Sequence, residues 1–171
     1  YVGRAKEIQK AQKAIEAGEC PVDAVPELKP VMEAVKKQFA DISKENVGVG
    51  STIFAVKPGD GSAREQAASC QKVLGGWANI ANEYATKRYR SNLINWGMLP
   101  FLIPEGELPF ANGDFLFFPQ ICKAVAEKAD SITGYVVKED GLREFQVTLG
   151  ELTDDEREII LKGCLINYNR K

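Results

Sequence analysis

The sequence contains one segment with a strongly defined local structure, Pro58-Gly59-Asp60-Gly61-Ser62-Ala63-Arg64-Glu65. Its two glycines can adopt positive φ angles and leave space for a ligand to approach the backbone. Ser62 and Glu65 have the spacing of a capping box, so we expect a helix to begin near Ser62. The segment therefore predicts a tight loop that leads directly into a helix N-terminus.

Such a loop can bind an anion. The first N–H groups of a helix lack carbonyl partners and carry a partial positive charge, which suits a carboxylate or a phosphate. Arg64 adds a planar guanidinium that binds carboxylates through two parallel hydrogen bonds. The same residues also fit an ordinary capped turn with a surface arginine. The rest of the chain has to decide between these two interpretations.

Length and charge narrow the class of protein. The chain has 171 residues, which suits one domain with a core of its own. Its 22 basic and 24 acidic residues give a net charge of −2 without a run of like charge. This balance argues against binding to nucleic acid or to a membrane surface. No apolar stretch approaches the ~18–20 residues that span a bilayer. We therefore expect neither nucleic acid nor membrane as a partner.

The histidine and cysteine content limits the chemistry. The chain has no histidine, and its four cysteines are far apart, at Cys20, Cys70, Cys122 and Cys164. We therefore expect no metal site built by this chain alone and no self-contained Ser–His or Cys–His nucleophile. Scattered cysteines without a C-x-x-C pair are typical of small buried hydrophobic residues in a reducing compartment, so we expect the cytoplasm.

Apolar periodicity and breakers predict a mixed α and β protein. Helices are expected at 4–17, 31–41, 62–74, 84–95 and 153–161. Strands are expected at 51–57, 77–81, 98–103, 131–138 and 142–149. Pro21, Pro26 and Pro30 predict an irregular connector, and residues 104–118 a packed loop. Asp140-Gly141 is a type I′ hairpin signal, and Thr153 with Glu156 forms a second capping box.

Two motifs carry a resemblance to a known family. Gly59 to Glu65, Ala67-Ala68 and Leu74-Gly75-Gly76 resemble the G-x-G-S-S-R-[ED]-x-A-A…L-G-[GV] signature of the swivel domain of the aconitase superfamily. Residues 89–100, which read YRSNLINWGMLP, resemble its second signature, H-R-S-N-L-x-x-x-G-[LMV]-L-P. The motifs occur in the expected order, and the resemblance covers about residues 31–137.

The resemblance implies a fold, a reaction and a cofactor. Members of the family are hydro-lyases and isomerases such as aconitase, homoaconitase and isopropylmalate dehydratase. Their larger part holds a [4Fe–4S] cluster through three cysteines, and the swivel domain, a β/β/α barrel-like fold, closes over it. It follows that the cluster would be bound by other domains of the same polypeptide or by a large subunit, and not by this chain.

The resemblance also assigns roles to individual residues. Ser62 matches the serine that acts as catalytic base, and Arg64 matches the arginine that grips a substrate carboxylate. Gly61 and Ala63 fall at substrate-binding positions. A serine hydroxyl is a very weak acid, so its alkoxide needs nearby N–H groups and a cation, which this segment supplies. Arg90 and Asn92, in the second motif, are expected to be structural.

The chain departs from the family at several positions. Ala63 replaces a second serine whose hydroxyl helps to bind a substrate carboxylate, and Gln66 stands where many relatives have histidine. Residues 1–50 contain no segment similar to D-H-I-S-P, and Arg4 is their only arginine. These departures put citrate-like specificity in question.

We expect an N-terminal helix with a Pro-rich connector at 1–30 and a swivel domain at 31–171. Because the chain starts at Tyr1 without a methionine, we expect it to be the C-terminal part of a longer protein. The leading hypothesis is a hydro-lyase acting on a hydroxy di- or tricarboxylate, inactive without its cluster-bearing part. The alternatives are a non-catalytic paralogue with a binding or regulatory role and a separate small subunit like that of isopropylmalate dehydratase.

Overall fold

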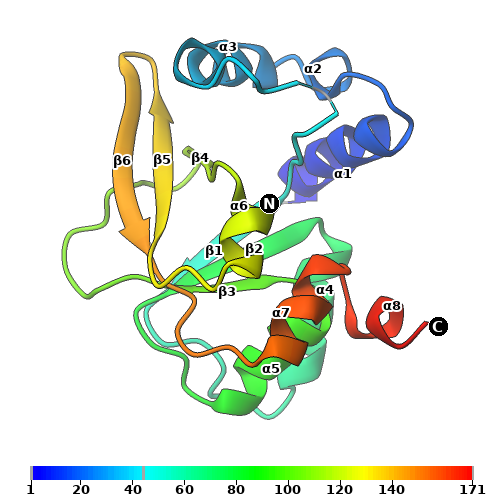
Figure 1. The fold of residues 1–171 in the computed structure, drawn as a ribbon, viewed down its shortest axis with the longest axis vertical. Coiled ribbons are helices and arrows are strands. Elements are labelled where there is room, and N and C mark those ends of the chain that lie inside the picture. Colours follow the sequence, from blue (N-terminus) through cyan, green and yellow to red (C-terminus); the bar gives the residue numbers. More distant parts are fainter. Residues whose placement is uncertain (1, 44, 171) are drawn as a thin grey trace.

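The computed structural model describes residues 2–43 and 45–170. Three parallel strands form one sheet in the order β1 (Ser51–Ala55), β2 (Gly76–Ala81) and β3 (Leu99–Leu102). The two crossovers that parallel strands require are α4 (Arg64–Val73) and α5 (Lys87–Asn95) (Figure 1). Since the strands run in one direction, the loops that follow them lie at the same edge of the sheet.

A second sheet is antiparallel, in the order β4 (Phe115–Phe117), β5 (Ile132–Lys138) and β6 (Gly141–Val147), with α6 (Ile121–Ala126) between its first two strands. The long β5–β6 hairpin projects from the body of the molecule (Figure 1). The two sheets are joined where Leu102 and Thr148 exchange backbone hydrogen bonds of 2.7 and 2.9 Å. This bridge links the end of β3 to the residue that follows β6.

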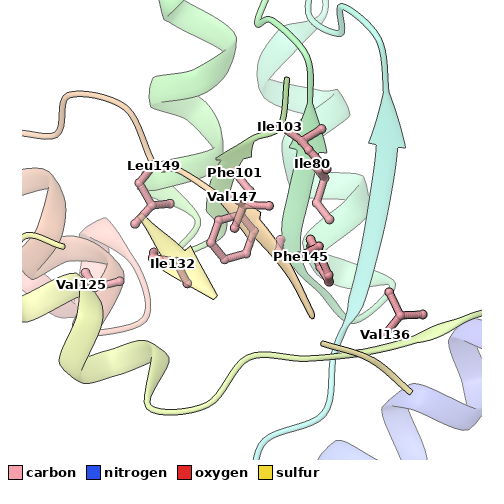
Figure 2. Packing of buried hydrophobic residues seen from close by; sticks show 10 residues of the cluster. Ile80, Phe101, Ile103, Val125, Ile132, Val136, Phe145, Val147 and Leu149 are labelled. Carbon is pink, nitrogen blue, oxygen red and sulfur yellow. The ribbon is translucent and has the colours of Figure 1, made fainter. Parts of the chain in front are cut away.

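The main hydrophobic core lies between the two sheets. Figure 2 shows Ile80 and Phe101 of the parallel sheet beside Phe145 and Val147 of the hairpin. Ile80 and Phe101 are also partners in the strand register. Phe118 stacks on Phe101 with a centroid distance of 4.7 Å. These contacts hold the hairpin sheet on one face of the parallel sheet.

Helices cover the opposite face of the parallel sheet. Successive strand residues point to opposite faces, so Asn79 points away from the core that contains Ile80. It meets α5, where Tyr89 and Leu93 pack with Ala68 of α4 in a second buried cluster. The order hairpin sheet, parallel sheet, helices is a β/β/α arrangement, and the predicted mixed α/β class is confirmed.

The N-terminal segment forms three helices, α1 (Val2–Glu16), α2 (Pro21–Ala24) and α3 (Leu28–Gln38). Gln12 of α1 donates hydrogen bonds to the carbonyl oxygens of Val49 (3.0 Å) and Gly75 (3.2 Å), at the start of the parallel sheet. Phe39, after α3, contacts the rings of Phe117 and Tyr135 edge to face. The segment is thus attached to both sheets.

Two helices end the described chain, α7 (Asp154–Leu161) and α8 (Leu165–Asn169). Thr153 and Glu156 form the predicted capping box at the start of α7. Arg157 donates a 3.1 Å hydrogen bond to the Val125 carbonyl of α6. Gly97 and Gly163 lie so close that a Cβ on Gly97 would be 1.8 Å from the Gly163 oxygen. These contacts hold α7 against α5 and α6. Among the residues described, none of the helices combines the length and apolar character that crossing a bilayer requires.

Several local predictions are wrong. Helix α4 begins at Arg64 and not at Ser62, and its N-cap, Ala63, makes no side-chain hydrogen bond. Glu65 instead accepts a 2.7 Å hydrogen bond from Trp96 Nε1, so the predicted Ser62–Glu65 box does not form. Lys138 pairs with Gly141, which leaves residues 139–140 as the hairpin turn. Neither of these two turn residues has a positive φ, so the predicted type I′ turn is absent.

The structure also adds elements and exposes cysteines. The predicted loop at 104–118 contains β4, and the predicted Pro-rich connector contains α2. All four cysteines are free, as expected, but none is fully buried, and Cys70 and Cys122 are exposed. The small hydrophobic role predicted for the cysteines is therefore wrong in this chain.

Of the two predicted capping boxes, only the one at Thr153 forms, so replacing the two capping residues should change the free energy of unfolding by different amounts. Thr153→Ala should lower the free energy of unfolding by about 1 kcal/mol because it removes a formed cap. Ser62→Ala should change it by less than about 0.5 kcal/mol, since Ser62 is exposed and caps nothing. Urea denaturation of both variants checks this, and equal losses would contradict the observed start of α4.

Candidate functional site

The two sequence motifs meet at the carboxyl edge of the parallel sheet. The loop after β1 contains Gly59 and Ser62, and the loop after β2 contains Thr86 at the start of α5. The loop after β3 joins them, because Asn82 donates hydrogen bonds of 3.1 Å to the carbonyl oxygens of Ile103 and Pro104. In open α/β sheets, ligands bind outside the carboxyl ends of the strands. This edge is therefore the candidate site.

The glycine loop, residues 58–63, rests directly on α5. Gly59 has a φ of 99°, and a Cβ at this position would lie 2.5 Å from the Cβ of Tyr89. No side chain fits there without a displacement, so the close approach requires glycine at this position. The N–H of Ala85 donates to the Pro58 carbonyl at 2.9 Å, which holds the loop from the β2 side.

The carbonyl oxygen of Gly59 accepts two side-chain hydrogen bonds. One comes from Arg64 Nε and the other from Thr86 Oγ1, both at 3.2 Å. Thr86 is also the N-cap of α5, where its oxygen accepts from the Tyr89 N–H at 3.2 Å. The first turn of α5 thereby supports the glycine loop and the arginine that follows it.

The residues between Gly59 and Arg64 face solvent. Gly61, Ser62 and Ala63 are exposed, and a Cβ on Gly61 would meet no atom within 4 Å. The Ser62 hydroxyl has no hydrogen-bond partner among the described residues. It immediately precedes the N-terminus of α4, where the first-turn N–H groups have no helical carbonyl partners. An exposed hydroxyl therefore lies beside unpaired N–H donors.

Arg64 is half-buried and oriented by the loop. Its Nε atom donates to the Gly59 carbonyl, and no carboxylate of the described residues forms an ion pair with it. Gly61, Ser62 and Ala63, at the exposed end of the glycine loop, are thus followed directly by Arg64, the first residue of α4. This geometry can accept a carboxylate at the guanidinium and at the N–H groups of α4.

Polar side chains that are buried (Asn79 and Tyr89) or half-buried (Gln71 and Tyr84) lie under the loop. The Tyr89 hydroxyl accepts hydrogen bonds of 3.1 Å from the amides of Asn79 and Gln71. The Tyr84 hydroxyl is within 3.3 Å of the Asn79 carbonyl and 3.1 Å of the Phe101 carbonyl. Burial raises the pKa of Tyr84 far above its ordinary value, so this hydroxyl remains a donor. Together these residues support the loop from the side of the parallel sheet and α5.

The second motif contributes structural contacts, as expected for Arg90. Its guanidinium donates to the backbone carbonyls of Leu149 (2.8 Å) and Glu151 (2.7 Å), which ties α5 to the segment before α7. Sequence reasoning missed Thr86, Tyr84 and Asn79 as parts of this framework. Thr86 directly before Lys87 is a recognisable N-cap signal, whereas the other two depend on tertiary packing.

The chain does not offer a metal site in its described part. Within residues 2–43 and 45–170, no three histidine, cysteine, aspartate or glutamate side chains gather around one point. An iron–sulfur cluster needs several thiolates around one point, and the cysteines of the described residues form no such group. The residues of this chain therefore do not fit a cluster.

Gly59→Ala tests the contact between the loop and α5. It should lower the free energy of unfolding by roughly 1–3 kcal/mol, because the added Cβ meets Tyr89 and the backbone has a positive φ. Gly61→Ala is the matched control and should be neutral or slightly stabilising, since it has open space around it. The pair is compared by chemical denaturation. Similar losses in both variants would contradict the close approach at Gly59.

Comparison with known proteins identifies the family. The family model described as the aconitase C-terminal domain matches residues 6–106. Among solved structures, the chain is similar to 3-isopropylmalate dehydratase (leuD) from Methanocaldococcus jannaschii, with 24% sequence identity and a TM-score of 0.45. That similarity covers 81% of this chain and 75% of the other. A search of curated proteins found no match. Since the family model matches more than half of the chain, the protein belongs to the aconitase C-terminal domain family.

Proposed function

We propose that this chain is the swivel part of an aconitase-like hydro-lyase that removes water from, or adds it to, a hydroxy di- or tricarboxylate. The observation that carries the proposal is the loop at residues 61–64. There an exposed Ser62 precedes an uncapped helix N-terminus, and Arg64 is oriented through Nε. Family membership supplies the reaction class, and the loop supplies groups that suit it.

Ser62 is the proposed base. It takes the proton from the carbon next to the one that bears the hydroxyl, so its oxygen must carry negative charge before the transfer. Unpaired N–H groups at the start of α4 and the nearby Arg64 cation lower the cost of that charge. Because no described residue forms a hydrogen bond with the Ser62 hydroxyl, this hydroxyl is available to substrate.

Arg64 is the proposed carboxylate-binding residue, and Gly61 and Ala63 line the same site. The N–H groups around these two residues can donate hydrogen bonds to a substrate carboxylate at close range, since neither residue carries a bulky side chain. Ala63 has no hydroxyl, so one hydrogen bond to substrate is missing relative to the family pattern. We propose that this difference directs the enzyme toward substrates other than citrate.

Family membership supports a proposal for the cofactor and the partner. We propose that a [4Fe–4S] cluster is held by a cluster-bearing part, either in the same polypeptide or in a large subunit. When bound there, the cluster activates the hydroxyl group of the substrate. This chain supplies the base and the carboxylate arginine and is inactive alone. We also propose a cytoplasmic location, since all four cysteines are free, and a swivel domain at 31–171 preceded by a segment at 1–30.

A second candidate is a non-catalytic paralogue that keeps the fold as a binding or regulatory module. Ala63 and Gln66 favour it, because Ala63 lacks the substrate-binding hydroxyl of the family pattern and Gln66 stands where many relatives have histidine. The two candidates differ in one measurable property, which is turnover in the presence of the cluster-bearing part.

Ser62→Ala tests the proposed base. The full-length protein is purified anaerobically with its cluster-bearing part and assayed on a panel of hydroxy di- and tricarboxylates. Ser62→Ala should lower kcat by about 10²–10⁴-fold, the usual contribution of a general base, and change KM by less than about threefold. Ser69→Ala on the same helix is the control and should retain wild-type rates, since Ser69 bonds only to the Gln66 carbonyl.

Two results would count against the proposal. Full activity of Ser62→Ala would remove serine from the role of base. A wild-type protein without a cluster and without turnover, under conditions that load a known relative, would favour the non-catalytic candidate.

A further inference from the structure

One backbone atom joins the glycine loop, the arginine and α5. The carbonyl oxygen of Gly59 accepts from Arg64 Nε and from Thr86 Oγ1, each at 3.2 Å, and all three residues are half-buried. Gly59 itself is held by the ring of Tyr89, which leaves no room for a Cβ. The direction of this carbonyl is therefore fixed from two sides.

The Thr86 hydroxyl both donates and accepts a hydrogen bond. The oxygen accepts from the Tyr89 N–H and caps α5, while the hydrogen is donated to Gly59. A valine at this position keeps the shape of the side chain and loses both bonds. A serine keeps both bonds and loses only a methyl group. The position therefore offers a clean pair of variants.

The bond to Gly59 also determines which edge of Arg64 is available. A guanidinium can bind a carboxylate side-on, through Nε and one Nη, or end-on, through both Nη atoms. Nε already donates a hydrogen bond to the Gly59 carbonyl, and no other described residue forms a hydrogen bond or an ion pair with Arg64. The end-on edge is the one left to receive a ligand.

We propose that Thr86 is a positioning residue for Arg64. Through the Gly59 carbonyl it holds the guanidinium so that both Nη atoms bind a substrate carboxylate end-on. This inference rests on the proposed function of the same site. Because Arg64 would hold a carboxylate in both the ground state and the transition state, loss of its orientation raises KM and leaves kcat nearly unchanged.

The test compares Thr86→Val, Thr86→Ser and Arg64→Lys in the assembled enzyme, on the panel substrate that is turned over. Thr86→Val raises KM about three- to tenfold, the size expected for one hydrogen bond, with kcat within about twofold. Thr86→Ser restores the wild-type KM. Thr153→Val removes the cap of α7 far along the chain and controls for lost stability; its KM stays at the wild-type value.

The outcomes distinguish the positioning role of Thr86 from the carboxylate-binding role of Arg64. A wild-type KM for Thr86→Val, while Arg64→Lys raises KM, overturns the positioning role alone. An equal KM rise in Thr153→Val also overturns it, because general loosening would then explain the effect. An unchanged KM for Arg64→Lys overturns both this inference and the proposed role of Arg64.

A second readout does not depend on turnover. In ¹⁵N spectra of this chain, the Arg64 Nε–H exchanges slowly with solvent in the wild type and in Thr86→Ser. In Thr86→Val it exchanges several-fold faster. Equal exchange rates in all three overturn the inference even if no substrate is found.

Discussion

The backbone of Gly59 lies against the ring of Tyr89, and the geometry of the site depends on this contact. A Cβ on Gly59 would approach the Tyr89 Cβ to 2.5 Å, so the loop can take this path only with glycine. The contact orients the Gly59 carbonyl, which holds Arg64 and meets Thr86. Tyr89 in turn is immobilised by the amides of Asn79 and Gln71. The exposed loop is thus built on a rigid support.

The rest of the fold keeps that support in place. Helix α5 has Thr86 as its N-cap and Tyr89 in its first turn, and through Arg90 it holds the backbone at Leu149 and Glu151. The same segment crosses from the hairpin sheet to α7, just after Thr148 has bridged to Leu102. The two sheets and the helical layer are therefore connected within a few residues of the site. Because its Nε atom is held by the Gly59 carbonyl, Arg64 would lose less conformational entropy on binding a carboxylate than a freely rotating arginine would.

Strong periodic patterns allowed most of the fold to be predicted from the sequence. The alternation of strands with helices between 51 and 102 predicted the elements that form the parallel sheet, and Thr153 with Glu156 predicted the start of α7 correctly. The candidate loop was found because glycines, serine and arginine are adjacent in the chain. Their roles in chemistry remain predictions, since they come from the family resemblance.

The errors come from tertiary contacts that local patterns do not encode. Glu65 has the spacing of a capping residue, but its carboxylate instead accepts a hydrogen bond from Trp96, 31 residues away. Strand β4 has only three residues and forms because β5 pairs with it. The hairpin turns at residues 139–140 because Lys138 pairs with Gly141, so Gly141 belongs to a strand. Thr86 could have been found as an N-cap, but its bond to Gly59 joins residues 27 positions apart.

Hydrogen–deuterium exchange of the assembled enzyme tests the central claim most directly, namely that the start of α4 binds substrate. The exposed loop and the first turn of α4 are compared with and without the hydroxy acid that is turned over. We expect slower exchange of the backbone N–H groups at residues 62–66 when substrate is present, with the exchange at residues 153–161 unchanged. Unaltered exchange at residues 62–66 during turnover would contradict it.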